Sequence, residues 1–138
     1  MSVFVDASAL YAVMDHDDSF HGRASIVWKG LLLAEERLIT HNYVLLECAA
    51  LFQNRLGMKA AKEFNDVIVP MLEIHWIDQR VHQAAAAALY ISGRKSLSLV
   101  DCISFETMRN LGITTAFAFD RHFNELGFKT AAPKPGNR

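Results

Sequence analysis

Three aspartates directly follow short apolar runs that have the composition of β-strands. They are Asp6 after residues 3–5, Asp78 after residues 74–77 and Asp120 after residues 116–119. In an open parallel sheet, ligands bind at the carboxyl ends of the strands, near the point where the strand order reverses. Acids at that position could hold a hard cation such as Mg²⁺, which prefers oxygen ligands. Each aspartate also precedes a helical pattern, and for any one of them taken singly helix capping is the more common role.

Two further acids, Asp101 and Glu47, lie on predicted helices. Asp101 is the third residue after Ser98, which matches the spacing of a capping box. Glu47 points away from the expected apolar face of its helix, so an ordinary solvated position is the alternative for it. That face is expected at Leu45, Ala49, Phe52 and Leu56.

If Asp6, Glu47, Asp101 and Asp120 converge, they form an acidic pocket. Two unit charges about 4 Å apart repel by roughly 4 kcal/mol at an effective dielectric constant of 20. A cluster of four carboxylates should therefore bind a metal ion or hold protons.

The elements that must position these acids alternate between short strands and longer helices. This order predicts an α/β fold in which helices cover both faces of a parallel sheet. The expected strands are residues 3–5, 38–40, 74–77, 115–119 and 128–131, and the expected helices are residues 7–14, 20–35, 42–56, 59–72, 79–91 and 98–111. Pro70 is expected to distort the end of its helix. We expect one domain over residues 1–132, followed by a tail over residues 133–138 that contains two prolines and a glycine.

The composition is that of a folded domain. The 138 residues suit a single domain, and a hydrophobic fraction of 51% excludes a disordered chain. The longest apolar run, residues 84–91, is much shorter than the roughly 18 residues of a membrane span. The N-terminus has no basic segment of the kind that begins a signal peptide, so we expect a cytoplasmic protein. Cys48 and Cys102 lie in helical patterns and are expected to be buried free thiols.

The net charge of −1, from 14 basic and 15 acidic residues, at first argues against a nucleic-acid substrate. Gathering four acids in one pocket leaves eleven acids against 14 bases, which is a charge of +3 for the rest of the molecule. One bound divalent ion would change the total from −1 to +1. The charge is therefore compatible with RNA, and it predicts that RNA binding depends on metal and on salt.

Four segments of the chain match the pattern of a known family. They are residues 3–10, 42–47, 96–105 and 116–123, which occur in the family's order and span nearly the whole chain. The chain resembles PIN-domain proteins, and most closely the small toxins of VapBC toxin–antitoxin pairs. The resemblance implies the strand order 3-2-1-4-5, which places Asp6 and Asp120 on neighbouring strands. It places Asp78 at the edge strand, so we interpret Asp78 as a helix cap.

The resemblance also implies a chemistry. It assigns the family's metal-binding acids to Asp6, Glu47, Asp101 and Asp120, and its small hydroxyl residue beside the first acid to Ser8. Cys102 departs from the alanine that is common at its position. The implied activity is that of an endoribonuclease that uses Mg²⁺ or Mn²⁺, in which a metal-activated water attacks a phosphodiester. Glu47 would either bind the metal or orient the water.

Basic residues near the predicted site are candidates for contacts with RNA phosphates, with ordinary solvated charges as the alternative. They are Arg94, Lys95 and Arg121. His122 could act as a general acid, although a metal ion can do that work. The residues do not select among messenger, initiator transfer and ribosomal RNA, or flap DNA, which are the substrates of related PIN proteins.

The resemblance further implies a cognate antitoxin. The helices over residues 20–35 and 42–56 carry many Leu, Val and Trp residues, more than one core needs, so we expect a homodimer and the antitoxin contact there. Two alternatives stay open, namely a stand-alone PIN nuclease without an antitoxin and a non-catalytic PIN-fold binding module. A phosphoaspartate enzyme or receiver domain is disfavoured, because Ala7 and Ser8 occupy the positions where those classes need a second acid.

Overall fold

The computed structural model describes residues 1–131, and the predicted tail over residues 133–138 lies outside them. A single sheet runs through the described chain. Its strands are β1 (Ser2–Val5), β2 (Arg37–His41), β3 (Glu73–His75), β4 (Thr115–Phe117) and β5 (Lys129–Thr130). They are ordered β3-β2-β1-β4-β5 and every pair is parallel. The predicted α/β class and strand order are confirmed.

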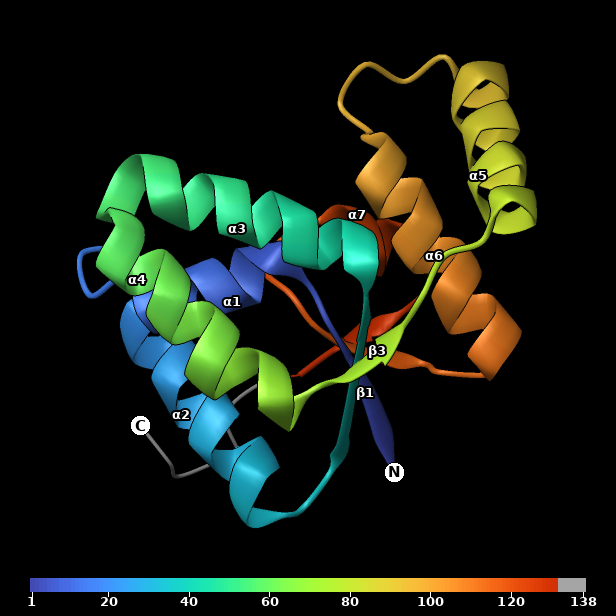
Figure 1. Cartoon of the computed structure of the whole chain (residues 1–138). Coiled ribbons are helices and arrows are strands. Elements are labelled where there is room, and N and C mark those ends of the chain that lie inside the picture. The colour runs from blue at the N-terminus through green and yellow to red at the C-terminus, as the bar shows by residue number, and fades with distance from the viewer. Residues whose placement is uncertain (132–138) are drawn as a thin grey trace.

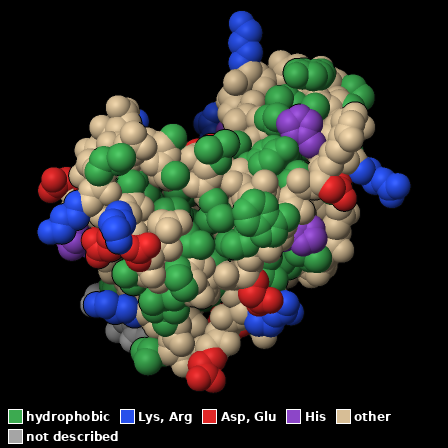
Figure 2. Space-filling model, viewed as in Figure 1, with side chains coloured by type: hydrophobic (Ala, Val, Ile, Leu, Met, Phe, Trp, Pro, Cys, Tyr) green, Lys and Arg blue, Asp and Glu red, His purple; other side chains and the backbone are tan. Residues whose placement is uncertain are grey.

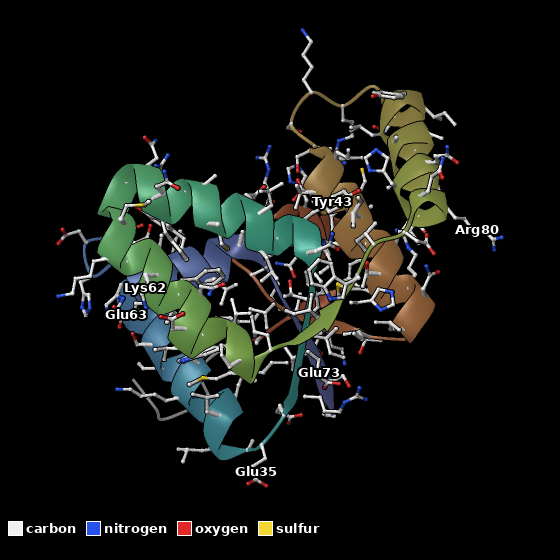
Figure 3. The ribbon with its side chains drawn as sticks, in the orientation of Figure 1. Glu35, Tyr43, Lys62, Glu63, Glu73 and Arg80 are labelled. Carbon is white, nitrogen blue, oxygen red and sulfur yellow. The ribbon has the colours of Figure 1, made fainter. Side chains whose placement is uncertain are left out.

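Helices cover both sides of this sheet (Figure 1). On one side lie α1 (Ala7–Met14), α2 (His21–Leu33), α3 (Asn42–Leu56) and α4 (Met58–Glu63), and on the other lie α5 (Gln79–Ser92) and α6 (Leu99–Leu111). The short helix α7 (His122–Glu125) follows β4. Tyr43 of α3 is hydrogen-bonded to His82 of α5, with 2.6 Å between Oη and Nδ1, so α5 is tied to α3 as well as packed on α6 (Figure 3). Within residues 1–131, no helix is both long enough and apolar enough to cross a membrane.

The helix predicted over residues 59–72 is broken into three pieces. After α4, the chain continues as a π-helical turn, η1 (Phe64–Ile68), and a 3₁₀ turn, η2 (Val69–Met71). Pro70 lies in the 3₁₀ turn, and its missing N–H and fixed φ explain why regular α-helix does not continue there. The predicted distortion at Pro70 is confirmed, and the single continuous helix was wrong.

Two strands end two residues earlier than predicted, because side chains take the backbone N–H groups that would extend them. The N–H of Ile77 donates to the Oδ1 of Asn42 at 2.7 Å, and β3 ends at His75. The N–H of Phe119 donates to the hydroxyl of Ser8 at 3.0 Å, and β4 ends at Phe117. Asp120 therefore follows its strand after a gap of two residues rather than directly.

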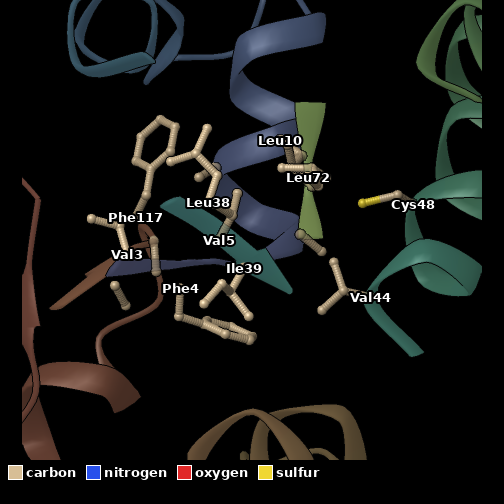
Figure 4. Close-up of a cluster of buried hydrophobic side chains, with 14 of the residues drawn as sticks. Val3, Phe4, Val5, Leu10, Leu38, Ile39, Val44, Cys48, Leu72 and Phe117 are labelled. Atoms are coloured by element: carbon tan, nitrogen blue, oxygen red, sulfur yellow. The ribbon is translucent and has the colours of Figure 1, made fainter. Parts of the chain in front are cut away.

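The core lies around β1, whose residues Val3, Phe4 and Val5 are all buried (Figure 4). Consecutive buried residues are expected for a central parallel strand that is covered on both faces. The apolar face of α3 runs through Val44, Cys48 and Phe52. Cys48 completes that stripe as a small apolar side chain, so Ala49 is exposed and its prediction as a core residue was wrong. Cys48 and Cys102 are buried free thiols, as predicted.

Candidate active site

Asp6 stands at the junction of β1 and α1. Its backbone N–H donates to the carbonyl oxygen of Phe117 on β4 at 3.0 Å, and its Oδ2 accepts from the N–H and the hydroxyl of Ser8 at 3.1 and 2.6 Å. The side chain therefore caps α1, as its position predicts. Asp6 is also only 4% exposed, and this burial raises the pKa of its carboxyl to about 6 although the Ser8 hydrogen bonds act in the opposite direction. A cap alone would be better served by a solvated, ionised carboxylate.

Ser8 connects the ends of the two central strands. Its hydroxyl donates to Asp6 at the end of β1 and accepts from the N–H of Phe119 beyond β4. Both contacts fix the position of Asp6 relative to the segment that leads to Asp120. This is the supporting position that the sequence predicts for Ser8.

Asp101 lies in the first turn of α6. The predicted capping box is present, since Ser98 N–H donates to Asp101 Oδ2 at 3.1 Å and Asp101 N–H donates to Ser98 Oγ at 3.0 Å. Burial raises the pKa of the Asp101 carboxyl, and the negative charge of Asp120 adds to the rise. The cap and a role in an acidic cluster are thus compatible in one residue.

Asp120 and His122 complete a compact group with Asp101. The Oδ1 of Asp120 accepts from the backbone N–H of His122 at 2.9 Å and lies 2.7 Å from its ring Nδ1. Asp101, Asp120 and His122 each present one ligand atom, and these three atoms lie within 4.8 Å of one another. The buried Nδ1 of His122 makes no hydrogen bond of good geometry within residues 1–131, despite its closeness to Asp120.

Glu47 joins this group through charge. It projects from α3 as an exposed residue, yet partial burial of its carboxyl, together with the charges of Asp6, Asp101 and Asp120, raises its pKa to about 7. The pKa of an ordinary solvated glutamate would not be raised by the charges of these three neighbours. All four predicted acids therefore influence one another, whereas Asp78 is exposed and caps α5 by accepting from Val81 N–H at 2.9 Å.

His122 is the member that sequence reasoning did not place among the metal ligands. Its signal was its position two residues after Asp120, in a segment already matched to the family. At that spacing the aspartate caps the following turn and the histidine ring folds back over the same carboxylate. This local geometry does not follow from the order of residue types.

The donor set of the site fits a divalent cation. Within the described chain, no lysine or arginine forms an ion pair with Asp6, Glu47, Asp101 or Asp120. The carboxylates supply the oxygen ligands that Mg²⁺ and Mn²⁺ prefer, and the buried Nδ1 of His122 adds a nitrogen beside them. A cation would offset the burial, and the smaller effect of mutual repulsion, that raise the carboxyl pKa values.

The basic residues near the site are partly neutralised. Arg94 Nη2 lies 2.9 Å from Glu125 Oε2, and Arg121 Nε lies 3.5 Å from Glu125 Oε1. Glu125 thus draws together two of the three residues that are predicted to contact phosphates. Lys95, the third, is exposed beside Arg94.

Known proteins resemble this chain over almost its whole length. A family model described as PIN domain matches residues 3–129. The 23S rRNA-specific endonuclease VapC20 of Mycobacterium tuberculosis, from strains CDC 1551 / Oshkosh and ATCC 25618 / H37Rv, is 29% identical over 133 residues, which cover 96% of this chain and 99% of the relative.

Two solved structures share the fold. The crystal structure of M. tuberculosis VapC20, described as a sarcin-ricin loop cleaving toxin, matches with a TM-score of 0.84 and 30% identity, covering 96% of this chain and 100% of that one. FitAcB from Neisseria gonorrhoeae matches with a TM-score of 0.69 and 13% identity, covering 95% of this chain and 97% of that one, and this likeness supports the fold alone.

Proposed function

We propose, from the premise that this chain belongs to the PIN domain family, that it is a divalent-metal-dependent endoribonuclease of the VapC type. The observation that carries the proposal is the convergence of Asp101, Asp120 and His122 within 4.8 Å, with Asp6 and Glu47 coupled to them by charge. A structural cluster would pair such acids with lysine or arginine. Here they are left for a ligand that carries positive charge.

Mg²⁺ or Mn²⁺ would be held by Asp6, Asp101 and Asp120, directly or through water, with His122 beside them. When bound, such an ion lowers the pKa of a water molecule and stabilises negative charge on the phosphate. Ser8 holds the Asp6 carboxylate by two hydrogen bonds, and the Ser98 cap holds that of Asp101. These contacts keep the oxygen ligands in place before RNA arrives.

Glu47 is suited to the proton transfer of hydrolysis. Without a cation, burial and the charges of Asp6, Asp101 and Asp120 raise the pKa of its carboxyl to about 7. A bound cation would lower this pKa again and leave Glu47 ionised, in the form that can accept a proton. We assign Glu47 to orient the attacking water and take its proton, and this choice is more specific than the sequence alone allows.

Ribosomal RNA is the substrate class that we propose to test first. The relative VapC20 is named as specific for 23S rRNA, and it covers nearly all of this chain. Arg94, Lys95 and Arg121 would bind phosphates beside the acids. Because Glu125 is paired with both arginines, RNA phosphates would have to replace its carboxylate.

A cognate antitoxin and a second copy of the chain are the partners we propose, with the reaction in the cytoplasm. Large apolar side chains stay exposed on several helices and on the segment after β3, including Leu46 at 71%, Trp76 at 71% and Ile91 at 87%. Apolar side chains gather on the face between α3–α4 and α5 (Figure 2). Light scattering during gel filtration and co-purification with the product of the adjacent gene would test both partners.

The decisive experiment is a cleavage assay on 23S rRNA with purified protein. Cleavage is expected with Mg²⁺ or Mn²⁺, and it should be lost with EDTA and in the Asp120→Asn variant. A protein that binds RNA but never cuts it, with either metal, would instead be a non-catalytic PIN-fold module. Cleavage by a protein that binds no antitoxin would identify a stand-alone nuclease.

A further inference from the structure

A buried histidine with no part in the proposed reaction lies behind the acidic site. His41 is the last residue of β2 and is 0% exposed. Its ring packs near Phe4 and Tyr43, with ring centroids 5.6 and 6.0 Å away. A polar side chain so deep in the core needs hydrogen-bond partners, because burying it without them is costly.

Both ring nitrogens of His41 have such partners, and these partners determine the tautomer. Nδ1 accepts from the backbone N–H of Val44 at 3.2 Å, which caps α3. The ring proton must then be on Nε2, which donates to the hydroxyl of Ser104 on α6 at 2.9 Å. The Ser104 hydroxyl donates in turn to the carbonyl oxygen of Val100 at 2.9 Å. The result is a continuous chain of three hydrogen bonds from α3 to α6.

The two ends of this chain lie next to the acids of the site. Val44 comes three residues before Glu47, and Val100 comes directly before Asp101. The neighbour of His41 makes a similar link, since the hydroxyl of Thr40, also 0% exposed, donates to the carbonyl oxygen of Val5 at 2.7 Å. Val5 directly precedes Asp6. The end of β2 is therefore tied to the backbone beside Asp6 and Asp101, and to the helix that carries Glu47.

Capping α3 does not by itself require histidine. Serine, threonine, asparagine and aspartate are the usual N-cap residues, and they are shorter. Only the length of the imidazole explains a bond that also reaches Ser104 on α6. Burial lowers the pKa of His41 to about 3, so the ring stays neutral and keeps accepting from Val44 at physiological pH.

We propose that His41, acting through Ser104, is a positioning residue that sets α3 and α6, and with them Glu47 and Asp101, at the separation the metal-dependent reaction requires. This inference rests on the proposed function, because the groups being positioned are its acids. His41 touches neither substrate nor metal. Its loss should therefore weaken metal binding and turnover while RNA binding is kept.

Two variants break the link from opposite sides, and a third serves as the control. Ser104→Ala removes the hydroxyl, and His41→Asn keeps a good N-cap but is too short to reach α6. Thr107→Val removes another buried hydroxyl from α6, one that has no hydrogen-bond partner within residues 1–131. Mn²⁺ affinity would be measured by calorimetry, kcat and KM by cleavage of 23S rRNA, and folding by circular dichroism, all well below the melting temperature.

Ser104→Ala and His41→Asn are each expected to weaken Mn²⁺ affinity and lower kcat by about tenfold, with KM nearly unchanged. The double variant should be little worse than either single one, since both break the same link. Thr107→Val should match the wild type in every measurement.

Wild-type Mn²⁺ affinity and kcat in a folded Ser104→Ala protein would overturn the proposal. Failure of Ser104→Ala to fold would overturn it as well, because the hydroxyl would then support the whole fold rather than the site. If the wild-type protein neither binds Mn²⁺ nor cleaves RNA, the proposed function itself fails, and this inference fails with it.

Discussion

The two ends of the sheet treat carboxylates in opposite ways. Near the amino ends of the strands, Glu73 of β3 (Figure 3) accepts hydrogen bonds from both Nε and Nη2 of Arg37 of β2 at 2.9 Å. Both residues line a hollow of about 210 Å³. Arg37 lowers the pKa of the Glu73 carboxyl. Near the carboxyl ends, burial raises the pKa values of Asp6 and Glu47 to about 6 and about 7.

The difference separates an acid that is paired with an arginine from acids for which we propose a metal ion as the partner. An exposed, paired carboxylate such as Glu73 contributes little to stability and costs little. A buried one such as Asp6 is costly, because raising its pKa from the ordinary value to about 6 corresponds to roughly 3 kcal/mol against the ionised form. Strongly shifted groups that share a site are candidates for function.

The largest expected effect comes from exchanging one carboxylate for an amide at each end. Asp6→Asn should lower cleavage of 23S rRNA by at least about 100-fold, because a ligand oxygen loses its charge. Glu73→Gln should leave the rate within about twofold and lower the stability by less than about 1 kcal/mol. Steady-state kinetics and thermal unfolding of both variants measure the contrast.

Equal losses of activity in the two variants would contradict the comparison, and so would wild-type activity in Asp6→Asn. Circular dichroism must show that Asp6→Asn is folded for its loss to count. Asparagine is also a good N-cap, so α1 should keep its start.

The second prediction concerns pH and metal together. Folding raises the pKa values of Asp6 and Glu47, so these groups cost stability as the pH rises through about 6 and about 7. A divalent cation favours the ionised acids, and its stabilising effect should therefore grow with pH. We expect saturating Mn²⁺ to raise the melting temperature little at pH 5 and by roughly 5 °C at pH 8.

The dependence of stability on pH in the absence of Mn²⁺ does not report on the acids alone, because His41 also contributes to it. Its pKa is lowered to about 3, so its contribution to stability rises with pH up to the unfolded value near 6.5, opposite to that of Asp6. The informative quantity is the difference with and without Mn²⁺ at each pH. A Mn²⁺ effect that is the same at pH 5 and pH 8, or that survives in Asp6→Asn, would argue against the acidic site.

The third prediction concerns Glu125, which forms ion pairs with Arg94 and Arg121 and lies on α7, the helix that also carries His122. Glu125→Gln should strengthen RNA binding by about two- to fivefold and make it more sensitive to salt, because Arg94 and Arg121 are released for phosphates. Glu106→Gln is the matched control, since the ion pair that Glu106 forms within the described residues is with Arg109 on α6, at 4.0 Å. Binding of RNA by a catalytically inactive background at several salt concentrations would measure both. If RNA affinity rises equally in the two variants, the gain comes from the change in net charge and not from the release of Arg94 and Arg121.

Much of the fold and of the candidate site could be predicted from the sequence. The rest depends on side-chain contacts that the order of residue types does not express. Alternating strands and helices were enough for the fold class, and the family pattern supplied the strand order. The ends of β3 and β4 could not be predicted, because side chains of Asn42 and Ser8, distant in sequence, take the N–H groups of Ile77 and Phe119. Packing of a ring over a carboxylate, as at His122, depends on backbone geometry that residue order does not express.

The smallest expected effect is at Asp78, which tests whether location or partners decide the role of an acid. Asp78 lies near the carboxyl end of β3 and caps a helix, as Asp6 does after β1, but it is exposed and is not among the ligand atoms that lie within 4.8 Å of one another. Asp78→Ala should lower the stability by about 1 kcal/mol, or about 3 °C in melting temperature, through the lost cap. The rate of RNA cleavage should not change. A loss of activity at unchanged Mn²⁺ affinity would mean that α5 itself contacts the RNA, and the functional end of the sheet would then extend to its edge strand.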